Sequence, residues 1–164
     1  MREFAKGAFT LRQAPRALRL IYAAFLLLVA VGVLTELGFQ VERIGLTPNR
    51  VAAYYRGSEQ SDVMTFPKTP GQLLEVTHAH AFMMAVVFLI LAHLFVSTSV
   101  SRRVHGVVLG VTFLGMGGDL VAPWLTRYGA AWCAWILLAS WAAQGLGTVV
   151  IVAVSGWDCL APTR

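Results

Sequence analysis

The chain carries four long runs of apolar residues separated by shorter polar segments. The runs extend roughly over residues 18–39, 70–98, 104–126 and 130–156. A helix needs about 20 mostly apolar residues to cross a bilayer, and each run reaches that length. Regular alternation of apolar and polar positions, the pattern of a membrane barrel, is missing from the sequence. The pattern predicts an all-α protein, a four-helix transmembrane bundle that forms one integral membrane domain over residues 1–164.

Composition supports a membrane protein. Hydrophobic residues make up 57% of the chain and charged residues 13%, whereas a soluble domain has about 25% charged residues. The first apolar run follows a basic stretch, as in a signal peptide. However, the run is long, and Glu36, Leu37 and Gly38 do not form a small-residue cleavage site. We therefore expect it to be a retained helix.

The basic residues indicate an orientation in the bilayer. Because the richer side usually faces the cytoplasm, we expect both termini in the cytoplasm and the protein in a bacterial inner membrane. The net charge of +5 then reflects topology and gives no reason to expect nucleic acid as a partner. The terminal side carries Arg2, Lys6, Arg12, Arg16, Arg19, Arg102, Arg103 and Arg164, and the opposite side carries Arg43, Arg50, Arg56, Lys68 and Arg127.

Residues 40–69 form a loop that is long for a simple turn, and such loops are often functional. Thr47 followed by Pro48 predicts a helix start, with a short helix over residues 49–56. Its tyrosines, Tyr54 and Tyr55, favour an interfacial helix over the mouth of the bundle. Both a plain surface helix and a substrate lid fit this pattern. Thr69-Pro70-Gly71-Gln72 resembles a capping box at the start of the second span.

Histidines within the apolar runs are the most informative residues. His78, His80 and His93 lie in the second run and His105 in the third. Ionisable side chains at lipid depth usually mark a functional site, and histidine is a common ligand of metals and haem iron. His78 and His93 are about 60° apart on a helix, whereas His80 lies about 200° from His78. We expect the His78–His93 stripe to face the third span across the bundle interior.

An inner candidate site pairs His93 with His105. Two imidazoles from facing helices can ligate a b-type haem from opposite sides, and Arg102 and Arg103 are placed to pair with its propionates. His78 is a competing axial ligand.

An outer candidate site combines Glu36, His78, His80 and Asp119, which the antiparallel arrangement places at one depth. Imidazole and carboxylate groups suit Zn, Fe, Mn or Cu. The same groups also suit a proton relay or the edge of a quinone pocket. Methionines of the second and third spans would favour copper, although methionines at helical spacing usually serve packing. These are Met83, Met84 and Met116.

The fourth run carries several tryptophans and two cysteines. We expect Trp132, Trp135, Trp141 and Trp157 to face lipid or the interface. Cys133 and Cys159 lie at opposite ends of this helix, roughly 40 Å apart, and are not expected to form a disulfide.

Three segments carry a resemblance to known proteins. Thr77-His78-Ala79-His80-Ala81-Phe82-Met83, Leu91-Ala92-His93-Leu94-Phe95 and Asp119-Leu120-Val121-Ala122-Pro123-Trp124-Leu125 are similar to small four-span bacterial membrane proteins with a Thr-His-x-His-x-Phe-x-Met helix. The resemblance covers residues 70–150 and implies the fold without an activity. The general plan also resembles four-helix b-type cytochromes in architecture, but fold alone does not carry function.

Together these features predict a membrane-embedded haem-b-binding electron-transfer subunit that exchanges electrons with quinone. Its partners would be the lipid bilayer and a larger redox complex or further copies of the chain. Two alternatives stay open. One is a protein that binds or transports Cu, Zn or Fe ions at the outer cluster, and the other is an accessory structural subunit of a respiratory complex. Motifs for phosphate binding and paired-thiol chemistry are missing from the sequence.

Overall fold

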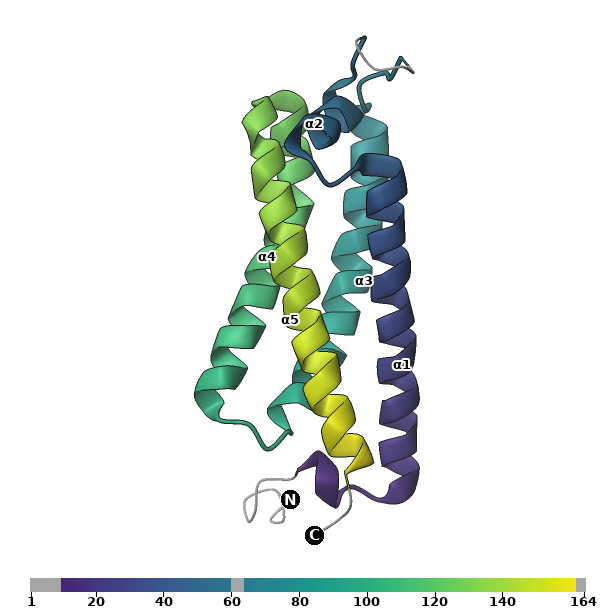
Figure 1. Cartoon of the computed structure of the whole chain (residues 1–164), viewed down its shortest axis with the longest axis vertical. Helices are drawn as coiled ribbons and strands as arrows, with labels where there is room; N and C mark the ends of the chain where they lie inside the picture. Colours follow the sequence, from purple (N-terminus) through teal and green to yellow (C-terminus); the bar gives the residue numbers. More distant parts are fainter. Residues whose placement is uncertain (1–9, 60–63, 162–164) are drawn as a thin grey trace.

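Four long helices form an antiparallel bundle in the computed structural model, which describes residues 10–59 and 64–161 (Figure 1). Each is long and apolar enough to cross a membrane. The prediction of an all-α, four-helix transmembrane bundle is therefore confirmed. The spanning helices are α1 (Arg16–Phe39, continued by the π-helical turn Gln40–Ile44), α3 (Pro70–Val96), α4 (Arg102–Tyr128) and α5 (Ala134–Leu160, preceded by the 3-10 turn Ala131–Cys133).

Side-chain caps fix the starts of α3 and α4. The Thr69 hydroxyl accepts a hydrogen bond from the Gln72 backbone N–H, and the Gln72 side chain accepts one from the Thr69 N–H. This confirms the predicted capping box. The Ser101 hydroxyl caps α4 by accepting a hydrogen bond from the backbone N–H of Val104. Helix α4 exceeds its predicted run at both ends, whereas α5 begins after the start of its run and ends beyond it.

The loop between α1 and α3 contains the expected short helix, α2 (Pro48–Arg56). The Thr47 hydroxyl caps it by accepting from the backbone N–H of Arg50. Helix α2 lies across one end of the bundle, which we call the loop end (Figure 1). The opposite end, where Leu11 and Leu160 lie, is called the terminal end. Both described ends of the chain therefore lie together, as an even number of spans requires. Which side faces the cytoplasm stays a prediction, and Arg2, Lys6 and Arg164 lie outside the described residues.

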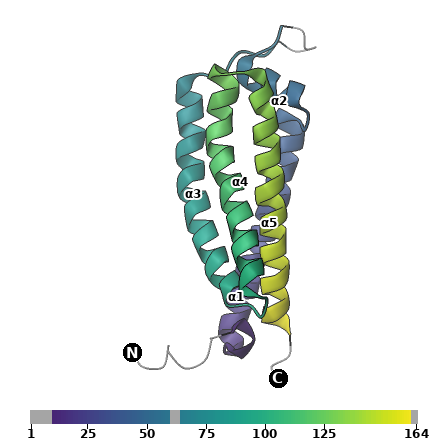
Figure 2. The same ribbon diagram turned by 90° about the vertical axis from the view of Figure 1, so that its left-hand side faces the viewer.

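The four helices do not pack equally. Figure 2 shows α3, α4 and α5 side by side, with α1 behind α5. Helices α4 and α5 approach most closely, because a Cβ added at Gly115 would lie 2.7 Å from the backbone nitrogen of Gln144. Helix α1 packs mainly against α5, and Leu26 is its one buried residue within Arg16–Phe39. Helices α4 and α5 thus form the most closely packed pair, and α1 and α3 pack less closely against it.

Buried side chains form two clusters, one at each end of the bundle. The loop-end cluster joins α2 to α3, α4 and α5 through residues such as Val51, Leu73 and Leu137. The terminal-end cluster joins α1, α3 and α5 through Leu26, Phe95 and other apolar side chains. Cys133 and Cys159 are buried and free, and they lie at opposite ends of α5. Between the two clusters the bundle is less tightly filled near α1.

Asp158 holds the terminal end together. Its side chain is almost fully buried and accepts hydrogen bonds from Arg12 Nε at 2.8 Å and from the backbone N–H of Ser99 at 2.9 Å. One carboxylate thus joins the segment before α1, the α3–α4 turn and α5. Arg19 adds a hydrogen bond to the carbonyl oxygen of Cys159 at 2.6 Å.

Replacing Arg12 with glutamine should lower the free energy of unfolding by about 1 kcal/mol, because a partly exposed charged hydrogen bond is lost while Ser99 still binds the carboxylate. Unfolding in mixed detergent micelles would measure the change. Arg16→Gln serves as a control, because the Arg16 side chain is exposed and makes no hydrogen bond within the described residues. Equal losses in the two variants would contradict a specific role for the Arg12–Asp158 pair.

Candidate functional site

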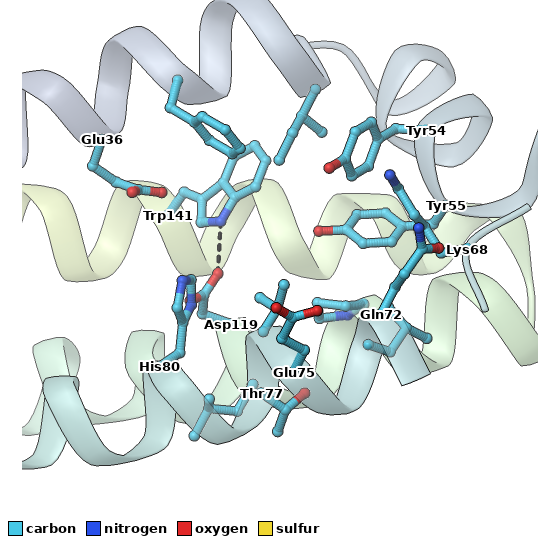
Figure 3. Close-up of a pocket in the computed structure, with 16 residues that line it drawn as sticks. Glu36, Tyr54, Tyr55, Lys68, Gln72, Glu75, Thr77, His80, Asp119 and Trp141 are labelled. Carbon is cyan, nitrogen blue, oxygen red and sulfur yellow. Dashed lines mark hydrogen bonds and ion pairs between the residues drawn. The ribbon is translucent and has the colours of Figure 1, made fainter. Parts of the chain in front are cut away.

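A hydrogen-bonded group of three side chains lies inside the bundle, in the half nearer the loop end (Figure 3). Asp119 on α4 is 8% exposed and accepts a hydrogen bond from Trp141 Nε1 on α5 at 2.7 Å. Its second oxygen lies 3.3 Å from Nδ1 of His80 on α3. A carboxylate in a bilayer needs such partners, because an unpaired charge there is costly. We call His80, Asp119 and Trp141 the central triad.

The triad leaves one histidine nitrogen available. With Nδ1 directed at Asp119, His80 Nε2 has no hydrogen-bond partner among the described residues. The half-buried ring is therefore fixed on one side and open on the other. A neutral imidazole offers an acceptor at this nitrogen and a protonated one offers a donor. The site can thus bind a polar atom and exchange a proton with it.

An apolar groove of about 820 Å³ leads to the triad from the side of the bundle. Helices α1, α3 and α5 form its walls, with a smaller contribution from α4. Leu28 and Met83 are two of its lining residues and are 71% and 65% exposed. Because these residues lie in spanning helices, the groove opens at lipid depth. Its lining also includes Phe25, Val29, Met84, Val87, Phe88, Leu91 and Met116.

A smaller cavity of about 360 Å³, more polar than the groove, reaches the triad from the loop end. We call it the vestibule. Its walls come from α2, the segment before α3 and the first turns of α3, together with residues of α1, α4 and α5. Figure 3 shows its polar side chains, which are Tyr54, Tyr55, Lys68, Gln72, Glu75 and Thr77. Four residues line both the groove and the vestibule: Glu36, His80, Asp119 and Trp141. The triad therefore stands where a lipid-side and a polar approach meet.

Three of the four residues predicted for the outer site are brought together around these cavities. Glu36 joins His80 and Asp119 from α1, and its carboxylate accepts a hydrogen bond from Gln40 Nε2 at 3.1 Å. His78 does not join them. It is exposed, and its ring packs edge-on against Phe82. Among the described residues, no group of three His, Cys, Asp or Glu side chains is placed to hold a metal ion.

The predicted inward orientation of the His78–His93 stripe is wrong. His78 and His93 are both exposed, and Phe82 and Leu89 between them are 65% and 68% exposed. Helix α3 is apolar on every side, so helical spacing fixed the relative angles of these residues without fixing which face turns inward. The inward face of α3 instead carries Leu73, His80 and Leu91. Their spacings correspond to about two and three helical turns, so the three residues share one side of the helix.

The structure does not join His93 and His105 by any contact. His105 Nε2 lies 3.1 Å from the Thr98 hydroxyl, and its ring packs edge-on against Phe95. Arg102 and Arg103 are exposed at the first turn of α4. Ligation of haem by His105 through Nε2 would require the Thr98 hydrogen bond to break. The assignment of this pair as haem ligands stays a prediction.

Trp141 and Tyr55 are site residues that the sequence did not identify as such. Trp132, Trp135 and Trp157 are exposed, as expected for lipid-facing or interfacial residues, but Trp141 is buried and binds Asp119. The sequence signal that could have identified Trp141 is helical spacing. Trp141 lies four residues after the buried Leu137, which places both residues on one face of α5. Tyr55 is buried beneath α2, and its place over the triad depends on how the loop folds back.

The fold and the site together define a multi-pass helical membrane protein with a polar centre at lipid depth. Residues 45–164, more than half of the chain, match a family described as a transmembrane helical domain. The chain belongs to this family. The matched region holds α2 to α5, and hence the central triad and the vestibule tyrosines, whereas Glu36 on α1 lies outside it. No curated protein and no solved structure matches the chain.

Proposed function

We propose that the protein is a quinone-binding subunit of a membrane electron-transfer system. The observation that carries the proposal is the apolar groove, which is open at lipid depth and ends at a polar, protonatable centre. A quinone has a small ring with oxygen atoms and a long apolar tail. The tail fits the groove, and the ring fits the end where His80 and Asp119 lie. Ligand pockets typically combine such an apolar lining with a few placed polar groups.

The chemistry of a quinone also fits the position of the triad. Oxidation of one quinol releases two electrons and two protons, and reduction of the quinone takes them up. His80 Nε2 can accept or supply a proton at the ring oxygen, and the polar vestibule leads from the triad toward the loop end. The electrons would pass to or from a partner redox protein or a haem. Quinone chemistry thus needs a proton path and a lipid path at one point, and the two cavities meet at His80.

The predicted haem b draws separate support from the exposed face of α3. His78 and His93 lie on this face among apolar side chains. Ionisable residues at lipid depth usually face protein or a cofactor. We therefore propose that a second copy of the chain or a subunit of a respiratory complex covers this face. His78 or His93 would hold haem b at this face, and the haem would supply one-electron transfer.

A Cu, Zn or Fe site has less support than quinone. His80 and Asp119 offer two ligands, Glu36 is held by Gln40, and His78 faces away. Structural and catalytic metal sites normally use three or four protein ligands. An accessory structural subunit fits the fold equally well but gives no reason for the open His80 nitrogen.

The purified protein in lipid nanodiscs should bind a tailed benzoquinone or naphthoquinone saturably at one molecule per chain. An absorption spectrum of the same preparation tests haem b independently, through reduced-minus-oxidised bands. A colourless preparation from haem-replete cells would contradict the haem part alone. Failure of both quinones to bind saturably would contradict the quinone proposal. Stoichiometric metal that disappears in Asp119→Asn would favour the ion-binding alternative.

A further inference from the structure

Tyr55 on α2 is a buried phenol directed into the vestibule. Its side chain is 8% exposed, and its hydroxyl has no hydrogen-bond partner among the described residues. In Figure 3 the hydroxyl points from α2 toward the hydrogen-bonded pair of Asp119 and Trp141. The hydroxyl oxygen faces the open space of the vestibule and is not one of the fully enclosed polar atoms, so a ligand that enters there can reach it. A ligand that displaced water from the vestibule would have to supply an acceptor, because buried polar groups are nearly always hydrogen-bonded.

The backbone around Tyr55 is firmly held. Val51, one turn earlier on α2, is fully buried. Arg56 Nη1 donates hydrogen bonds to the carbonyl oxygens of Thr126 at 3.2 Å and Gly129 at 3.0 Å, at the end of α4. The Tyr55 carbonyl oxygen accepts from the backbone N–H of Lys68 at 3.0 Å. Helix α2 is thus attached to the bundle on both sides of Tyr55, and the phenol is held in place before any ligand binds.

The Tyr55 hydroxyl is suited to donate a hydrogen bond. Burial, and to a smaller extent the nearby Tyr54, Asp119 and Glu36, raise the pKa of Tyr55 well above its ordinary value. The hydroxyl therefore stays protonated over the physiological range. It acts as a neutral hydrogen-bond donor and not as a base. His80 approaches the same space from α3 and carries the open Nε2.

We propose that Tyr55 is a binding residue of the quinone site, donating a hydrogen bond to one ring oxygen while His80 binds the other. The inference rests on the proposed quinone function and adds α2 to the site. It makes the loop helix one wall of the ring-binding pocket, so the expected ligand is a ring with oxygens on opposite edges. The sequence allowed two interpretations of this helix, a plain surface helix and a substrate lid. The inference favours a helix that covers the site as a lid does but stays in place.

Tyr55→Phe removes the hydroxyl and keeps the ring packing. Equilibrium binding of a short-tailed naphthoquinone in nanodiscs should weaken roughly 3- to 10-fold, as expected for one neutral hydrogen bond. Tyr128→Phe is the matched control. Tyr128 ends α4 at the loop end of the bundle, is 53% exposed and lines neither cavity. The affinity of this variant should equal that of the wild type.

A monoketone analogue that lacks one ring oxygen completes a double-mutant cycle. If Tyr55 binds that oxygen, the losses from the variant and from the analogue are not additive, because both remove the same hydrogen bond. Wild-type affinity in Tyr55→Phe, together with lost binding in His80→Ala, would overturn the role of Tyr55 and leave the quinone site standing. Absence of quinone binding by the wild type would overturn the proposed function, and this inference with it.

Discussion

His80→Ala should weaken quinone binding roughly 10- to 100-fold, the loss expected for a hydrogen bond to an ionisable group. The His80 imidazole lies where the groove and the vestibule join. Its Nε2 has no hydrogen-bond partner among the described residues and can therefore bind a ring oxygen of the quinone. The variant should still fold, because Asp119 keeps its hydrogen bond from Trp141. Equilibrium binding of a tailed quinone in nanodiscs would measure the effect.

His78→Ala provides a control on the same helix. His78 lies two residues from His80 but is exposed and packs against Phe82, away from both cavities. Its replacement should leave quinone affinity within about twofold of the wild type. An equal loss in the two variants would mean that the histidines act through helix stability or through a partner on the exposed face. The central triad would then not be the binding site.

Gly115→Ala should lower the free energy of unfolding by about 1–3 kcal/mol, the usual cost of overpacking. The added methyl carbon would lie 2.7 Å from the backbone nitrogen of Gln144 and 2.9 Å from the carbonyl oxygen of Ser140. Backbone atoms cannot rotate away as side chains do, so α4 and α5 would have to separate. Because this interface also positions Asp119 against Trp141, quinone affinity should fall as well. Unfolding in mixed micelles measures the first effect.

Gly110→Ala is the matched control on the same helix. A Cβ at Gly110 meets nothing within 4 Å. Replacing glycine by alanine inside an open helix position should raise stability by about 0.5–1 kcal/mol. The two variants are therefore expected to change stability in opposite directions. A loss of similar size at both positions would show that helix propensity or lipid contact, and not the close approach of α4 and α5, decides the outcome.

The fold was predictable because each of its determinants is local in sequence. Run length predicts the spans, and Thr47, Pro48 and Thr69 predict the starts of α2 and α3. Helix ends were less accurate, because capping and buried partners such as Asp158 extend a helix beyond its apolar run. The pairing of the terminal segments also required the structure, since Arg12 and Asp158 are 146 residues apart.

The level of the site along the bundle could be predicted from the sequence, but the face of α3 that turns toward it could not. Antiparallel folding places Glu36, His80 and Asp119 at one level, as expected. The sequence could not decide which face of α3 turns inward, because its apolar residues surround the helix. The helical stripe of the sequence includes His78, whereas in the structure His80 faces the site and His78 is exposed. Tyr55 was out of reach for a different reason, since its contact with the site depends on the path of a thirty-residue loop.

The groove opens sideways from the bundle, so a ligand would reach the site from the surrounding lipid. A molecule that arrives through it never leaves the hydrocarbon phase, so aqueous concentration does not govern binding. The relevant variable is the mole fraction of the ligand in the surrounding lipid. Diluting the proteoliposomes with buffer should leave the bound fraction unchanged, whereas adding empty lipid should reduce it in proportion.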